Sequence, residues 1–272
     1  MVLKMKFNIH AGHNADGKVA CGAVGLIKES TEARVIKDKV IQYLRKAGHT
    51  AYDCTCNNGT SQNDVLRKII EKCNSYDVDI DVSIHFNSGA KDKKGNGKST
   101  GVEVLVYKET SKCYAEAVRV AKKISAIGFK NRGIKVRDDL YVLRKTKAPA
   151  MLIEVCFVDD KDDVDIYNKN VDKIAKAIAE ALINKTINDV VKKETATSTL
   201  KKNTNQSGRY RVEITADVLK VRKGAGTSFG TNGSVRKGQV YTIVDEKYNG
   251  PTKWGKLLSG AGWISLSFTK KL

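Results

Sequence analysis

Two histidines of this chain stand where a catalytic site can form. His13 follows an alternating apolar segment at residues 5–9, and His85 ends another at residues 78–85. In parallel sheets, ligands bind at the carboxyl ends of the strands, so both imidazoles are expected where a ligand can bind. Glu29 precedes a helical pattern. Two imidazoles and a carboxylate that meet at one point make a zinc site with an open coordination position.

A second carboxylate, Glu154, lies inside the apolar segment 150–157. A lone carboxylate in such a segment is unfavourable unless it is paired or functional. We interpret Glu154 as a candidate general base. A buried ion pair with Arg144 is the structural alternative. His49, just past a predicted helix end, is expected at the surface.

The segments that carry these residues alternate between strand and helix patterns. Strictly alternating or continuous apolar residues predict strands, and apolar residues every three or four positions predict helices. Ser61 begins one helix as a capping residue before Asp64. The pattern predicts an α/β domain with a mostly parallel sheet flanked by helices. The expected strands are 5–9, 78–84, 102–106 and 150–158, and the expected helices are 31–47, 61–73, 112–127 and 171–182.

The composition changes after residue 184. Residues 185–206 are polar and are interpreted as a linker. Residues 207–272 contain short β segments separated by glycines, which predicts a small all-β barrel. We therefore expect a catalytic domain at 1–184, the linker, and a second domain at 207–272.

Length and charge narrow the class of protein further. The chain has 272 residues and a formal net charge of +19, which favours an anionic partner. A nucleic acid is not expected, because no helix carries a basic stripe and few aromatic residues lie among the cations. No apolar run reaches the ~20 residues of a membrane span, and no signal peptide is recognised, so no membrane insertion is expected. The six cysteines are interpreted as free thiols.

Four motifs in residues 5–183 resemble the zinc-dependent N-acetylmuramoyl-L-alanine amidase domain of the amidase-3 type, found in autolysins and phage endolysins. They are Ala11-Gly12-His13, Glu29 before the first long helix, Ser83-Ile84-His85-Phe86-Asn87, and Glu154 between Pro149 and Phe157. The stretch from Leu140 to Arg144 also resembles the family.

The resemblance implies that His13, Glu29 and His85 bind Zn²⁺ and that Glu154 accepts the proton of the attacking water. The bond cut would join N-acetylmuramic acid to the first L-alanine of peptidoglycan. Asn87 and Arg144 are expected to contact substrate. Two departures from the family pattern stand out. His10 is an alternative ligand to His13, and Cys156 replaces a common glycine.

The C-terminal segment is similar to bacterial SH3 domains, which implies binding to the cell wall. The similarity starts at Leu219-Lys220-Val221-Arg222-Lys223-Gly224. Tyr210, Trp254, Trp263 and Phe268 are candidates for stacking on wall sugars or peptides, with Trp263 favoured as a core residue. The expected protein is a phage endolysin that stays in the cytoplasm until it is released through a holin pore. An autolysin, a mother-cell lysin and a non-catalytic wall-binding protein are the alternatives.

Overall fold

The computed structural model describes residues 4–187, 210–258 and 260–272. The chain divides into two compact units, Met1–Asp189 and Val190–Leu272. Most of the predicted linker, residues 188–206, lies outside the described residues. Among the described helices, none is long and apolar enough to cross a bilayer.

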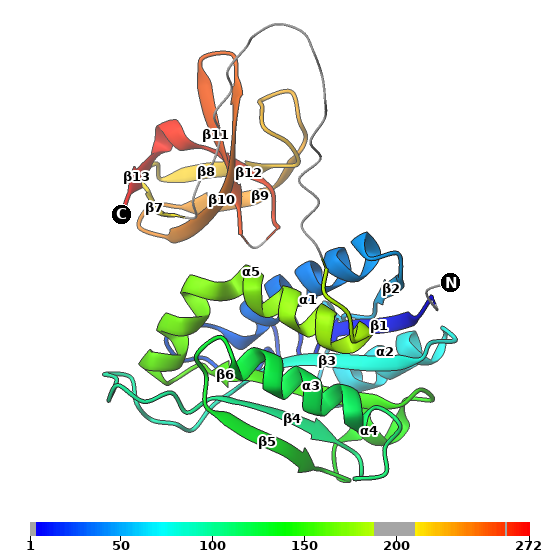
Figure 1. Cartoon of the computed structure of the whole chain (residues 1–272). Coiled ribbons are helices and arrows are strands. Elements are labelled where there is room, and N and C mark those ends of the chain that lie inside the picture. The colour runs from blue at the N-terminus through cyan, green and yellow to red at the C-terminus, as the bar shows by residue number, and fades with distance from the viewer. Residues whose placement is uncertain (1–3, 188–209, 259) are drawn as a thin grey trace, which may run out of the picture. The chain divides into compact units, whose positions relative to one another are not determined.

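The first unit is built on a six-stranded sheet with the order β2-β1-β3-β6-β4-β5 (Figure 1). The pairs β1–β2, β1–β3, β3–β6 and β4–β5 are parallel, and only β4–β6 is antiparallel. The prediction of a mostly parallel sheet is therefore confirmed. The strands are β1 (Lys6–Ala11), β2 (Thr50–Asp53), β3 (Ile80–Asn87), β4 (Val102–Val106), β5 (Asn131–Val136) and β6 (Ala150–Phe157).

Helices cover both faces of this sheet. On one face α1 (Glu29–Lys46) and α3 (Tyr114–Ser125) pack against α5 (Lys161–Ile183) (Figure 1). On the other face α2 (Gln62–Asn74) packs against α4 (Tyr141–Lys145). The central strands are consequently almost fully buried, as expected of a sheet covered on both sides.

Side-chain caps mark the start of two helices, α2 and α5. The Ser61 side chain accepts a hydrogen bond from the Asp64 amide, so the predicted cap of α2 is confirmed. Helix α5 begins at Lys161, capped by Asp160, ten residues before the predicted apolar pattern. Its first part was missed because it is mostly polar, and non-helical backbone at Asn170 separates it from the apolar part.

The second unit is an antiparallel seven-stranded sheet with the order β13-β7-β10-β11-β12-β8-β9. Val212, Val221, Ile243 and Ile264 lie in its apolar core. The all-β prediction is confirmed, and assignment to the SH3 class stays a prediction. The elements are β7 (Tyr210–Ile214), β8 (Val218–Arg222), β9 (Thr231–Arg236), β10 (Val240–Asn249), β11 (Thr252–Leu257), β12 (Trp263–Ser265), η1 (Leu266–Phe268) and β13 (Thr269–Lys271).

Both tryptophans of the second unit are buried, Trp254 at 4% and Trp263 at 8% exposure. The core position favoured for Trp263 is confirmed. The expectation that Trp254 stacks on a wall component is wrong, because its side chain is buried. Phe268 is half exposed and retains an accessible ring.

Candidate active site

Three predicted metal ligands meet at the carboxyl edge of the first sheet. His13 follows β1, His85 lies near the end of β3, and Glu29 is the first residue of α1. The Glu29 Oε1 atom lies 3.2 Å from His13 Nε2 and 2.9 Å from His85 Nδ1. One donor atom from each residue lies within 4.8 Å of the other two. This group can hold a metal ion.

Two glycines make room for these side chains. A Cβ atom on Gly12 would lie 1.6 Å from His85 Nε2, and one on Gly22 would lie 2.5 Å from Glu29 Oε2. Gly22 also has a φ of +80°, which disfavours other residues. The backbone therefore leaves the imidazole of His85 and the carboxylate of Glu29 the space that they occupy.

The protonation states suit a metal. Burial acts to raise the pKa of Glu29, but hydrogen bonds from His13 and His85 outweigh it and hold this pKa well below its ordinary value. Burial lowers the pKa of His85. A carboxylate anion and a neutral imidazole are the forms that bind metals. A His₂Glu set on an accessible edge fits a catalytic zinc ion by ligand type and number.

Backbone contacts hold the ligands in place. Glu29 accepts hydrogen bonds from the amides of Ala23 and Phe86. The Arg34 guanidinium donates to the carbonyl oxygen of His13 at 2.8 Å. These contacts fix the carboxylate of Glu29 and the backbone at His13, and hydrogen bonds of this kind orient the ligands of metal sites.

Glu154 lies next to His85 in the register of β3 and β6, as predicted for a group that acts at the same edge. Its Oε2 atom is buried and has no hydrogen-bond partner. Burial, reinforced by the negative charges of Glu29 and Glu103, raises the pKa of Glu154 to about 8. The structure records no ion pair between Glu154 and Arg144 within its described residues. A carboxyl group that titrates near neutral pH is suited to general acid–base chemistry.

Sequence reasoning missed Glu103, which pairs with Glu154 across β4 and β6. Glu103 forms an ion pair with Arg132 at 2.7 Å and accepts a hydrogen bond from Asn87 Nδ2 at 2.9 Å. Its signal in the sequence is the one that identified Glu154, a lone carboxylate between apolar strand residues. Glu103 thus adds negative charge beside Glu154 while remaining paired itself.

A mostly apolar cavity of about 170 Å³ opens beside the histidines. His13 and His85 form part of its wall, and α2 and α4 supply Val65, Leu66 and Tyr141. The cavity lies on the face of the sheet that α2 and α4 cover. It provides a water-poor surface next to the candidate metal site, where a substrate can be held.

The other candidate residues lie apart from this group. His10 is fully buried, with Nδ1 3.4 Å from the Ser83 hydroxyl, and burial lowers its pKa to about 3. Cys156 is also buried, and burial raises the pKa of its thiol. The surface position expected for His49 is wrong. Its ring packs against Phe7 and accepts a hydrogen bond from the Met5 amide, because the chain enters β2 directly after His49 and β2 pairs with β1.

The two predicted substrate contacts occupy different settings. Asn87 ends β3, and its side chain is held by Glu103 and by the Ser88 amide. Arg144 is exposed on α4, with its guanidinium 5.9 Å from the ring centroid of Tyr141. The Asn87 amide is therefore engaged within the protein, whereas Arg144 is exposed near Tyr141, which lines the apolar cavity. A substrate role for either stays a prediction.

All six cysteines are free thiols, as predicted.

Comparison with known proteins decides the family. Residues 8–184 match the sequence profile of N-acetylmuramoyl-L-alanine amidases of the amidase-3 type. The chain belongs to this family. The amidase is 29% identical to the endolysin of Bacillus phage SPP1 over 77% of this chain and 75% of that protein.

Two further relatives cover most of the amidase unit. An uncharacterized Clostridium perfringens protein, CPE1502, is 33% identical over 89% of this chain and 69% of its own length. The catalytic domain of the CD27L endolysin, which targets Clostridia difficile, superimposes with a TM-score of 0.60 at 32% identity. That superposition covers 68% of this chain and 99% of the CD27L domain. The protein is accordingly an N-acetylmuramoyl-L-alanine amidase that acts on peptidoglycan.

Proposed function

We propose that this amidase is a zinc-dependent, phage-endolysin-type enzyme that lyses bacterial cell walls. The observation that carries the proposal is the convergence of His13, Glu29 and His85 beside Glu154. The two imidazoles and the carboxylate are the ligand types of a catalytic zinc site. The similarity to the phage SPP1 endolysin supports the biological role.

Each site residue has a defined part in hydrolysis. His13, Glu29 and His85 would hold the zinc ion, which polarises a carbonyl group and makes water more acidic. The carboxylate of Glu154 accepts a proton from the attacking water. As the amide bond breaks, Glu154 returns this proton to the departing nitrogen of L-alanine. Its raised pKa allows Glu154 both to take and to release the proton near neutral pH.

The second unit is proposed to be an SH3-type domain that binds the cell wall, joined to the amidase domain by the linker at 185–206. Its excess of Lys and Arg supports attraction to an anionic wall. Peptidoglycan is the proposed partner, and no nucleic acid or membrane is involved. The enzyme is proposed to accumulate in the cytoplasm until a holin pore releases it.

A first experiment tests the chemistry. The metal-free full chain is reloaded with one equivalent of Zn²⁺ and incubated with purified cell walls, and mass spectrometry follows newly exposed L-alanine amino termini. We expect Glu154→Gln to lower the rate by at least about 10²-fold, the range for loss of a general base. Retention of the wild-type rate in this variant would refute the assignment of Glu154.

A matched pair of variants tests the metal. Glu29→Gln removes a proposed ligand, whereas Glu32→Gln changes the next acidic residue of α1, which accepts the Tyr167 hydroxyl instead. Calorimetric titration should show zinc affinity reduced by about tenfold or more only in Glu29→Gln. Equal affinity in both variants would contradict the ligand set.

A third experiment tests the biological role. The full chain is expressed inside bacteria with and without a separate holin, and culture turbidity is recorded. The proposal expects rapid lysis only when the holin is present. Lysis without a holin would instead identify an enzyme that reaches the wall by its own route.

A further inference from the structure

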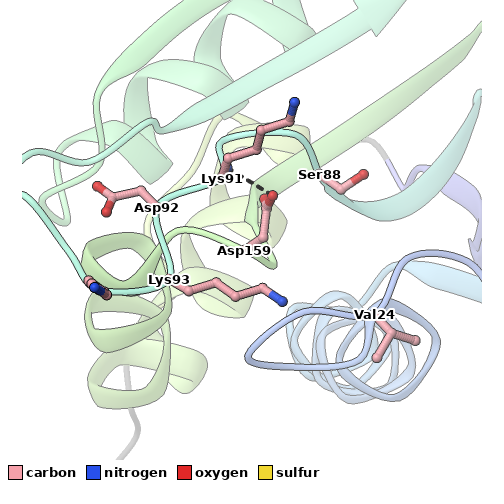
Figure 2. A pocket seen from close by; sticks show the side chains of 7 residues that line it. Val24, Ser88, Lys91, Asp92, Lys93 and Asp159 are labelled. Carbon is pink, nitrogen blue, oxygen red and sulfur yellow. Dashed lines mark hydrogen bonds between the residues drawn. The ribbon is translucent and has the colours of Figure 1, made fainter.

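A basic pocket lies outside the zinc-ligand group. It has a volume of about 550 Å³, and Lys91, Lys93 and Lys94 form part of its wall. Ser88, Asp159 and Val24 form the rest of the wall used in this argument. Figure 2 shows Lys93 extending past Asp159 toward Val24, while Asp92 points away from Ser88 and Val24. The part of the pocket between Asp159 and Val24 therefore faces the ammonium group of Lys93.

Hydrogen bonds connect this pocket to the catalytic edge. Ser88 directly follows β3 and is three residues from His85. The Val158 amide donates to the Asn87 carbonyl, and the Val158 carbonyl accepts the Leu26 amide. Three residues span at most about 10 Å, so a ligand of dipeptide length can reach from one site to the other.

The loop that carries the lysines is held in place by acidic side chains. Asp159 accepts hydrogen bonds from the amides of Gly89, Ala90 and Lys91. Asp92 accepts a hydrogen bond from the Gly95 amide. Lys91 has a φ of +58°, an unfavourable conformation for a residue with a side chain. The hydrogen bonds to Asp159 hold this strained backbone and thereby set the direction of the Lys91 side chain.

Asp159 and Asp92 thus accept hydrogen bonds from backbone amides and leave the ammonium groups free. Within the described part of the chain, Lys91, Lys93 and Lys94 form no ion pair, although Asp92 and Asp159 lie in the same pocket. The carboxylate of Asp159 already accepts hydrogen bonds from the amides of Gly89, Ala90 and Lys91, and that of Asp92 points away from Ser88 and Val24. A carboxylate from outside is the complementary ligand for this surface.

We propose that this pocket is a subsite for free carboxylates of the peptidoglycan stem peptide, next to the L-alanine whose amino group the enzyme frees. Lys91 and Lys93 bind the carboxylates, and the Ser88 hydroxyl can donate a further hydrogen bond. The inference rests on the proposed function, because it places the stem peptide across the catalytic edge. It adds a preference for acidic over amidated stem peptides.

Two muramyl dipeptides test the proposal by binding alone. One is N-acetylmuramoyl-L-Ala-D-Glu with both carboxylates free, and the other has both carboxylates amidated. Calorimetry on the metal-free full chain should show the diacid bound about tenfold more tightly, because each exposed ion pair changes a binding constant about threefold. In Lys91→Gln/Lys93→Gln this preference should fall below about twofold.

The matched control is Lys108→Gln/Lys112→Gln, which removes the same charge from an exposed loop before α3. It should retain the tenfold preference. Equal binding of the two dipeptides to the wild-type chain would overturn the proposal. A preference for the diacid that survives in Lys91→Gln/Lys93→Gln would also overturn it. The same holds if this variant loses only its binding to walls that carry phosphate polymers.

Kinetics on the zinc-loaded chain separate this proposal from the proposed function. The lysine variant should raise KM for the diacid about tenfold and leave kcat within about twofold. Absence of hydrolysis by the wild-type chain would refute the amidase chemistry, while the calorimetric preference would still support the subsite. Normal hydrolysis without a preference for the diacid would refute the subsite alone.

Discussion

The carboxyl group of Glu154 makes the stability of the metal-free protein depend on pH. Its pKa is raised from 4.5 to about 8, mainly by burial. Below pH 4.5 the group is protonated in both the folded and the unfolded chain. As the pH rises from 4.5 to 8, the unfolded chain loses this proton while the folded protein keeps it. Folding therefore becomes less favourable across this window and levels off above pH 8.

Glu154→Gln removes this dependence, since an amide does not titrate. At about 1.4 kcal/mol per pH unit, the full effect between pH 5 and pH 9 is about 4 kcal/mol. Because the Glu154 side chain is not fully buried, we expect the change in the free energy of unfolding to be about 2–4 kcal/mol. The free energy of unfolding of the variant, relative to that of the wild type, should increase by this amount from pH 5 to pH 9.

Urea unfolding followed by circular dichroism at 222 nm measures the effect. All α-helices of the described residues lie in the first unit, so this signal reports the amidase domain. Both tryptophans lie in the second unit, and their fluorescence serves as an internal control that should not change between variants. A difference in the free energy of unfolding between variant and wild type that is constant from pH 5 to pH 9 would show that the pKa of Glu154 is not raised by folding.

Two further substitutions test the packing around the site. Gly12→Ala introduces a Cβ 1.6 Å from His85 Nε2, so zinc affinity measured by calorimetry should fall about tenfold or more. Gly230→Ala is its control, because a Cβ atom at Gly230 would have no neighbouring atom within 4 Å. Equal zinc affinities of the two variants would show that the His85 ring can move aside. Asp163→Ala leaves the buried amides of Gly101 and Phe157 without their acceptor and should lower the free energy of unfolding by about 3 kcal/mol in urea titrations. An effect below about 1 kcal/mol would mean that water replaces the carboxylate.

Much of the fold was predictable because its strands and helices have strong local patterns. The buried strands β3 and β6 alternate or run apolar throughout, and α2 begins at a capping serine. The strands β2 and β5 were missed because edge strands are short or partly exposed and carry little apolar pattern. The five-residue helix α4 has too few residues for a helical period.

The residues of the candidate site were identified in the sequence by chemistry and motif order, but their arrangement depends on the tertiary structure. The chemical groups of the site follow from the amino-acid sequence alone: His13, Glu29, His85 and the lone carboxylate Glu154. Only the parallel pairing of β1, β3 and β6 brings His13, His85 and Glu154 to one edge, where Glu29 at the start of α1 accepts the hydrogen bond of the Phe86 amide. The burial and neighbouring charges that raise the pKa of Glu154 come from residues distant in sequence. Such effects depend on distances in space, which local sequence patterns do not encode.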